Sequence, residues 1–227
     1  MKFLDNLLWV FFPKRCVCCG RVIERTFHLC KTCEADINKA DKICVKCGAY
    51  KHKCECKFTV YHFEGCVAPI VRDEASMRVI SNLKFRDNID VADYLAEKMS
   101  ESVNTYYGDI DFDGVFAVPM DEDKKRRKGF NQSEVLARRI AARIGVPYID
   151  KLYKKRKTKT QHTLKRAERF ENVKDAFACA RLGRVANVLL VDDIKTTGAT
   201  LDECTRELMF AGADKVYCLT ALVNMRY

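Results

Sequence analysis

Two adjacent carboxylates, followed by a loop of small and hydroxyl-bearing residues, form the pattern in this sequence best suited to ligand chemistry. The stretch 188–200 is VLLVDDIKTTGAT, so Asp192 and Asp193 end an apolar run and a Thr/Gly-rich segment leads into a predicted helix. Backbone N–H groups of such a segment and the N-terminus of a helix hold phosphate. Carboxylates repel phosphate, but they accept hydrogen bonds from sugar hydroxyls and coordinate Mg²⁺. The pattern therefore predicts a ribose 5-phosphate site; the alternative is that Asp193 caps a turn and the threonines form an ordinary loop.

Paired cysteines near the N-terminus form a second candidate site, for metal. Among 13 cysteines, eight occur in close pairs: Cys16/Cys19, Cys30/Cys33, Cys44/Cys47 and Cys54/Cys56. A Cys-x-x-Cys turn directs two thiolates at one cation, and two turns complete a tetrahedral structural Zn²⁺ site. A sequential assignment gives two ions, while an interleaved assignment, a single occupied site, or His28 or His52 as a ligand stays open. The odd cysteine count disfavours a disulfide framework, and a missing βαβ context disfavours a redox motif.

Basic residues are the third chemical feature. The chain carries 41 Lys+Arg and 31 Asp+Glu, a net charge of +10, which favours polyanionic partners. Two runs concentrate this charge: 124–128, which contains Arg127 and Lys128, and 151–169. They attract either a phosphorylated ligand or the backbone of single-stranded DNA; the alternative is a solvated surface. The second run includes Lys154, Lys155, Arg156 and Lys157.

Strands alternating with helices must position these groups. We expect strands over 59–63, 114–118, 188–191 and 216–223, and helices over 89–103, 133–144 and 201–210. An earlier helix is expected to carry Ile70, Met77, Ile80 and Leu83, and a long polar loop to follow Pro119. This order predicts an α/β fold: a mostly parallel sheet with helices on both faces, which binds ligands at the carboxyl ends of its strands. We expect a small N-terminal helix and zinc-binding domain over 1–57 and the α/β domain over 58–227.

The apolar stretch 3–12 places Leu4, Leu7, Leu8 and Phe11 on one helical face. It is shorter than the roughly 20 residues that a membrane span needs, and no small-residue cleavage site follows it. We therefore expect no transmembrane segment and no signal peptide. Together with the paired thiols, this favours a cytoplasmic protein.

Several motifs together resemble a known family. VLLVDDIKTTGAT is similar to the phosphoribosyl-pyrophosphate (PRPP) motif of type I phosphoribosyltransferases. The cysteine pairs, SNLKFRD at 81–87, VPM at 118–120, RKGFNQSEVLAR at 127–138, TKTQ at 158–161 and RFENVKDAF at 169–177 occur in the order seen in the ComF family of competence proteins. The resemblance covers nearly the whole chain and implies a type I phosphoribosyltransferase-like fold.

This resemblance implies roles for individual residues. Asp192 and Asp193 are expected to hold the ribose hydroxyls, and Thr196, Thr197, Gly198, Ala199 and Thr200 the 5-phosphate. Val118, Pro119 and Met120 correspond to the pyrophosphate loop, Lys84 and Arg86 approach it from an earlier helix end, and 153–171 corresponds to a flexible hood. Two departures stand out: Lys128 replaces a more usual arginine, and the acidic run 121–123 follows the pyrophosphate loop directly.

Two functions follow from this resemblance. The first is Mg²⁺-dependent phosphoribosyl transfer from PRPP to an unidentified acceptor, linked to competence and DNA uptake. The alternative is a non-catalytic module that binds single-stranded DNA or a competence protein on the same fold. A third reading is a zinc-dependent scaffold in which Phe3, Trp9 and Phe12 dock a partner. The sequence identifies no catalytic residue beyond the PRPP contacts.

Overall fold

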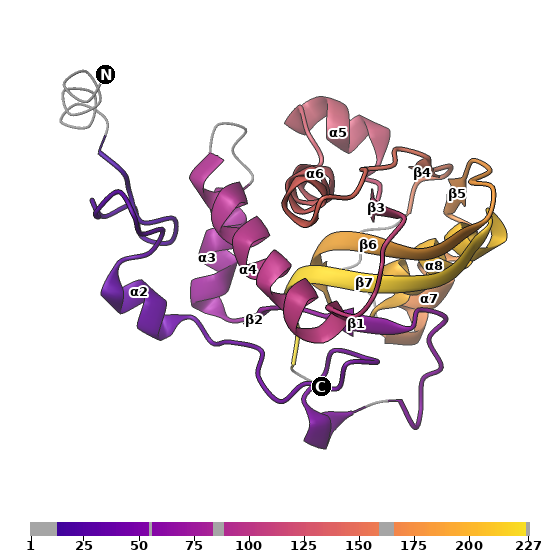
Figure 1. Cartoon of the computed structure of the whole chain (residues 1–227), viewed down its shortest axis with the longest axis horizontal. Helices are drawn as coiled ribbons and strands as arrows, with labels where there is room; N and C mark the ends of the chain where they lie inside the picture. The colour runs from indigo at the N-terminus through magenta and orange to yellow at the C-terminus, as the bar shows by residue number, and fades with distance from the viewer. Residues whose placement is uncertain (1–12, 55, 84–88, 159–165, 226–227) are drawn as a thin grey trace.

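A parallel β-sheet forms the body of the molecule (Figure 1). The structure is a computed structural model that describes residues 13–54, 56–83, 89–158 and 166–225. Five strands form the sheet in the order β1-β7-β6-β3, with β2 also paired to β7, and all of these pairs are parallel. The strands are β1 (Gly65–Val67), β2 (Ile70–Val71), β3 (Gly114–Ala117), β6 (Val185–Lys195) and β7 (Ala213–Val223).

Helices cover both faces of this sheet (Figure 1). One face packs against α3 (Glu74–Asn82), α4 (Ile89–Tyr107) and α6 (Gln132–Ile144), and the other against α8 (Ala199–Phe210), on which α7 (Arg166–Val173) lies. Side chains of β6 alternate between the two cores, Leu189 and Val191 on the first and Val188 and Leu190 on the second. The predicted mostly parallel sheet with helices on both faces is confirmed.

Smaller elements surround this body. The cysteine-rich segment contains α2 (Lys31–Asp36) and a 3₁₀ turn, Lys51–Lys53. It adjoins the sheet beside β2, where the Ala40 N–H donates to Pro69 O (2.9 Å) and the Val71 N–H to Asn38 O (2.8 Å). A short helix, α5 (Glu122–Lys128), follows β3, and β4 (Leu152–Lys154) pairs antiparallel with β5 (Phe177–Cys179).

The expected strand over 59–63 is wrong. Tyr61 and Phe63 are buried, as the alternation predicts, but the His62 N–H donates to the Asp202 carboxylate (2.6 Å) instead of to a neighbouring strand. The first strand begins at Gly65, and Ile70, expected in a helix, lies in β2. Pairing with β7 extends β6 to Lys195, so the two aspartates lie within the strand and not after it.

The expected polar loop after Pro119 is also wrong, because residues 122–128 form α5. Glu122 and Asp123 lie in its first turn and the basic residues in its last, which complements the helix dipole at both ends. The acidic run that follows the pyrophosphate-loop motif is thus explained locally as the start of a helix.

None of the helices in the described residues is long and apolar enough to cross a membrane. The expected helix over 3–12, with its apolar face, lies outside the described residues.

Candidate functional site

A cavity of about 430 Å³ opens where β2, β3 and β6 end, at the carboxyl edge of the sheet. This volume falls within the roughly 300–1,000 Å³ typical of small-molecule sites. Segments distant in sequence line it: residues 118–121 after β3, 192–196 of β6 and the loop that follows, and Met77 and Ile80 of α3. Parallel sheets bind their ligands at this edge, as the sequence predicts.

Most of the sequence-predicted ligand contacts meet in this cavity. Those lining it are Val118, Pro119, Met120, Lys128, Lys154, Asp192, Asp193, Thr196, Gly198 and Thr200. Thr197 and Ala199 are buried and do not line the cavity. Arg127, Lys155, Arg156 and Lys157 are exposed and do not line the cavity, and Lys84 and Arg86 lie outside the described residues.

Asp192 is held at the base of the cavity by two donors. Its Oδ1 accepts hydrogen bonds from Ser133 Oγ (2.7 Å) and from the Asp193 N–H (2.9 Å). Burial, together with the adjacent Asp193 carboxylate, raises the pKa of Asp192 to about 8. Two carboxylates in such a position are best stabilised by a cation or by hydroxyl donors.

The start of α6 connects the two lining segments. Asn131 caps the helix by accepting from the Ser133 N–H (3.1 Å), and its Nδ2 donates to Val118 O (3.0 Å). Val118 N–H in turn donates to Val191 O (2.9 Å). The first turn of α6 therefore fixes the end of β3 through Asn131 and Asp192 through Ser133.

The phosphate-loop candidate, 196–200, leads into α8. Gly198 has φ +83, a conformation that favours glycine, and a Cβ there would lie 3.1 Å from Tyr61 Cε1. The Tyr61 hydroxyl donates to Thr197 O (3.0 Å), and its ring stacks on Phe63 with centroids 4.7 Å apart. Where its backbone approaches the cavity, the loop is thus confined by the Tyr61 ring and by the hydrogen bond from the Tyr61 hydroxyl.

The charge lining the cavity is positive on balance. Six basic side chains line it against three acidic ones: Arg72, Lys124, Lys128, Lys154, Arg169 and Lys195, and Asp121, Asp192 and Asp193. Burial lowers the pKa of Lys154, whose ammonium donates to Thr158 Oγ1 (2.8 Å). A cavity of this kind attracts a polyanion while offering carboxylates for a cation or for hydroxyl groups.

The sequence analysis assigned no role to Arg72, Asn131, Gln132, Ser133 or Lys195, which line the cavity, whereas Lys124 and Arg169 belong to the basic runs expected to attract a phosphorylated ligand. The signal for Asn131 was present, because an asparagine directly before a predicted helix is a preferred N-cap. Nothing in the local spacing indicates that Ser133 contacts Asp192 or that Arg72 faces the cavity.

The eight paired cysteines form two separate clusters in sequential order, Cys16, Cys19, Cys30 and Cys33, and Cys44, Cys47, Cys54 and Cys56. Within each cluster the sulfurs lie within 4.8 Å of one another, and neither His28 nor His52 contributes. A tetrahedral ion with Zn–S bonds of about 2.3 Å separates its sulfurs by about 3.8 Å. Both clusters therefore suit structural zinc, and the interleaved assignment is not the one found.

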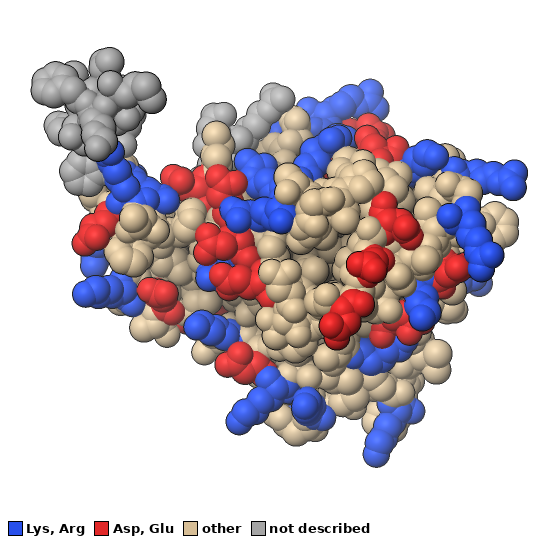
Figure 2. Space-filling view, viewed as in Figure 1, with Lys and Arg blue, Asp and Glu red and all other residues tan. Residues whose placement is uncertain are grey.

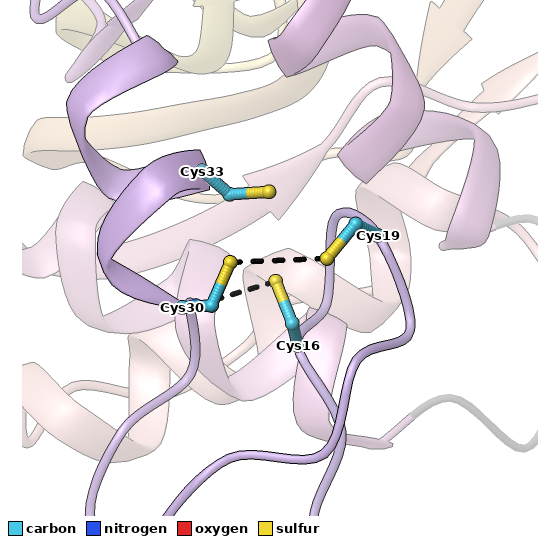
Figure 3. Close-up of side chains that lie close together, drawn as sticks. All are labelled: Cys16, Cys19, Cys30 and Cys33. Atoms are coloured by element: carbon cyan, nitrogen blue, oxygen red, sulfur yellow. Dashed lines mark hydrogen bonds between the residues drawn. The ribbon is translucent and has the colours of Figure 1, made fainter.

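Backbone turns preorganise both clusters. In the first, Sγ of Cys19 and Cys30 are 3.8 Å apart, the Cys30 N–H donates to Cys16 Sγ (3.4 Å), and Cys33 projects from α2 (Figure 3). In the second, the Cys44 and Cys56 sulfurs are 3.8 Å apart and those of Cys47 and Cys54 3.9 Å.

Comparisons with known proteins agree with this arrangement. Residues 7–59 match the family described as a double zinc ribbon domain. The chain is 26% identical over 225 residues to Competence protein F of Haemophilus influenzae, covering 91% of this chain and 95% of that protein. It is 25% identical over 210 residues to the DNA utilization protein YhgH of Escherichia coli K12 (90% and 88%) and 25% identical over 221 residues to Competence protein ComFC of Streptococcus pneumoniae (89% and 96%).

Solved structures show weaker similarity. Glutamine PRPP amidotransferase from B. subtilis matches 71% of this chain at 20% identity, with a TM-score of 0.43, and this chain spans 31% of it. Adenine phosphoribosyltransferase from Thermoanaerobacter pseudethanolicus matches 69% of this chain and 90% of its own, at 12% identity and a TM-score of 0.40. Over about nine tenths of its length the chain is thus similar to proteins named Competence protein F, ComFC and YhgH, and residues 7–59 match a double zinc ribbon.

Proposed function

We propose that this chain binds PRPP with Mg²⁺ in the cavity and transfers its phosphoribosyl group to an acceptor. The observation that carries the proposal is the convergence, at one edge of the sheet, of two carboxylates and a hydroxyl-rich loop at a helix N-terminus. The 5-phosphate would lie at 196–200, the ribose hydroxyls at Asp192 and Asp193, and the pyrophosphate at Val118, Pro119 and Met120.

The carboxylates that line the cavity fit Mg²⁺. Asp121, Asp192 and Asp193 line the cavity and would supply the oxygen ligands that this hard cation prefers. The bound ion would neutralise charge that develops on the departing pyrophosphate. Lys124 and Lys128 also line the cavity and would stabilise that charge further, so catalysis would consist mainly of positioning and electrostatic stabilisation.

Calorimetric titration of the zinc-loaded protein with PRPP, with and without Mg²⁺, tests this proposal. Binding is expected to require Mg²⁺ and to weaken at least about 100-fold in Asp192→Asn/Asp193→Asn, because each lost charged contact costs about 1.5–3 kcal/mol. The matched control Asp214→Asn removes a carboxylate at the opposite end of the sheet and should leave affinity unchanged. Equal PRPP affinity in the double variant would exclude this site.

Single-stranded DNA is the second candidate ligand, and the placement of the two basic runs favours it. Lys157 forms an ion pair with Asp123 of α5, which lowers the pKa of Asp123 and brings the runs together. Lys and Arg side chains gather over α5 and along the β4–β5 edge (Figure 2). Tyr153, which is 53% exposed, lies on this edge and offers a stacking surface, whereas Phe170 is half-buried.

Neutralising this surface separates the two functions. Lys155→Gln/Arg156→Gln should weaken single-stranded DNA binding and reduce its salt dependence by about 1.4 in slope for two phosphate contacts. PRPP affinity should stay the same, since neither residue lines the cavity. An unchanged salt slope would remove this surface from DNA binding.

The names of the relatives connect the proposal with competence and DNA utilization. We further propose a cytoplasmic location, supported by the 13 cysteines, none of which forms a disulfide in the structure. Under this proposal the zinc ions are structural and Mg²⁺ accompanies the substrate.

A further inference from the structure

We propose that Lys195 contributes a buried positive charge to the phosphate end of the cavity, and that Tyr61 positions the loop beside it. This inference rests on the proposed function and deepens it: it assigns one end of the cavity to a phosphate monoester, the 5-phosphate of the phosphoribosyl ligand. The sequence analysis assigned neither residue a role: Lys195 lies within the 188–200 motif, and Tyr61 lies far from it in the chain.

Lys195 is the last residue of β6 and only 3% exposed, yet it lines the cavity beside Thr196 and Gly198. Within the part of the chain that the structure describes, no ion pair joins its ammonium to a carboxylate. The Tyr61 ring lies 5.8 Å from Nζ, near the outer limit of about 6 Å for a cation–π contact. A buried ammonium is costly without a counter-charge. An anion in the cavity would supply that counter-charge.

Tyr61 fixes the orientation of the peptide between Thr197 and Gly198. Its buried hydroxyl donates to Thr197 O (3.0 Å). Because the C=O and N–H of one trans peptide point in opposite directions, this bond turns the Gly198 N–H away from Tyr61. The Tyr61 ring also occupies the space that a Cβ at position 198 would need, so the loop closely follows the ring.

These features distinguish the two ends of the cavity. The phosphate end combines a buried ammonium, the hydroxyls of Thr196 and Thr200 and the N-terminus of the 12-residue helix α8. A phosphate monoester dianion matches such a donor set. At the other end, Lys124 and Lys128 accompany the 118–120 segment, which the proposed function assigns to pyrophosphate. Loss of Lys195 should therefore affect the two ligand groups unequally.

The test measures the affinities of ribose 5-phosphate and of pyrophosphate with Mg²⁺ for the zinc-loaded wild type and Lys195→Met. Ribose 5-phosphate should bind on the order of 10–100-fold more weakly to the variant, and pyrophosphate less than about 3-fold more weakly. The ligand-free variant should unfold at a higher temperature than the wild type, because an uncompensated buried charge is gone. Lys215→Met, an exposed lysine on β7 at the opposite end of the sheet, is the charge-matched control.

Tyr61→Phe tests the positioning role, since it keeps the ring and removes the hydroxyl that donates to Thr197 O. The substitution should weaken the binding of ribose 5-phosphate several-fold and leave the affinity for pyrophosphate unchanged. If Lys195→Met lost affinity equally for both ligands, or for neither, the inference would be overturned. PRPP binding by the wild type would still uphold the proposed function. A wild type that binds none of the three ligands would overturn both.

Discussion

The two cysteine clusters have the same ligands but support different walls of the cavity. The first packs on α3: Asn82 Nδ2 donates to Val17 O (2.8 Å), Cys18 Sγ lies 3.7 Å from Ala75 O, and α3 supplies Met77 and Ile80 to the cavity. The second lies beside β1, where the Cys66 N–H donates to Val45 O (2.7 Å). Cys47 of this cluster shares a core with Tyr61. The two similar clusters thus pack against different elements beside the cavity, the first against α3 and the second against β1.

Removal of one cluster at a time should have the largest effect. Cys54→Ser/Cys56→Ser should release one Zn²⁺ and weaken ribose 5-phosphate binding, because the segment leading to Tyr61 loses its anchor. Cys16→Ser/Cys19→Ser should also release one Zn²⁺, but should raise hydrogen exchange in α3 instead. Each structural site supplies about 10–16 kcal/mol of apparent free energy.

Metal content by mass spectrometry and amide hydrogen exchange measure these effects. Cys179→Ser, outside both clusters, is the control and should retain both ions. The same exchange pattern in the two double variants would mean that the clusters do not act on separate walls.

Two glycines offer a finer comparison. Gly20 and Gly48 follow Cys-x-x-Cys pairs with φ +73 and +70, but a Cβ at Gly20 meets nothing within 4 Å, whereas at Gly48 it lies 2.8 Å from Cys66 O. Gly20→Ala should cost about 1 kcal/mol of unfolding free energy from backbone strain. Gly48→Ala should cost about 3 kcal/mol or more, because strain and a clash with β1 combine. Chemical denaturation of the zinc-loaded variants measures both, and equal costs would contradict the close packing of the second cluster on β1.

The sheet and the cysteine clusters should respond to pH in opposite directions, because Asp192 stabilises the folded sheet at lower pH whereas the clusters bind metal more weakly there. Its folded pKa of about 8 exceeds the ordinary value of 3.8, so between these values the folded state holds the extra proton. The unfolding free energy should therefore rise as pH falls from 8 towards 4, by at most about 1.4 kcal/mol per pH unit. Metal binding needs deprotonated thiolates, so it weakens as the pH falls over the same range. Denaturation of the wild type and Asp192→Asn at several pH values isolates the contribution; identical pH profiles would contradict it.

Ser133→Ala should have the smallest effect. It removes the 2.7 Å bond to Asp192 Oδ1 and should cost about 1 kcal/mol. Since that bond favours the ionised form, the pKa of Asp192 should rise further in the variant. Titration of Asp192 by carbon-13 NMR checks the direction, and a lower pKa would contradict the role assigned to Ser133.

The spacing of residues predicted those parts of the fold and the site that depend on contacts between residues close together in the sequence. The cysteine pairs indicated metal because each turn is built from adjacent residues, and the run from Val188 to Thr200 indicated a strand, a loop and a helix in the correct order. The contacts of Tyr61, Asn131, Ser133 and Lys195 depend on segments distant in sequence, and no periodicity encodes them. The strand expected over 59–63 failed for the same reason, since Asp202, far along the chain, bonds the backbone of His62.

Amide chemical shifts of the zinc-loaded protein, recorded as PRPP and Mg²⁺ are added, test the central claim most directly. The largest shifts are expected at residues 196–200 and at Asp192 and Asp193, with smaller ones at Val118 and Met120. Shifts confined to α5 and the β4–β5 edge, with none at 196–200, would contradict it and would leave the basic surface as the functional one.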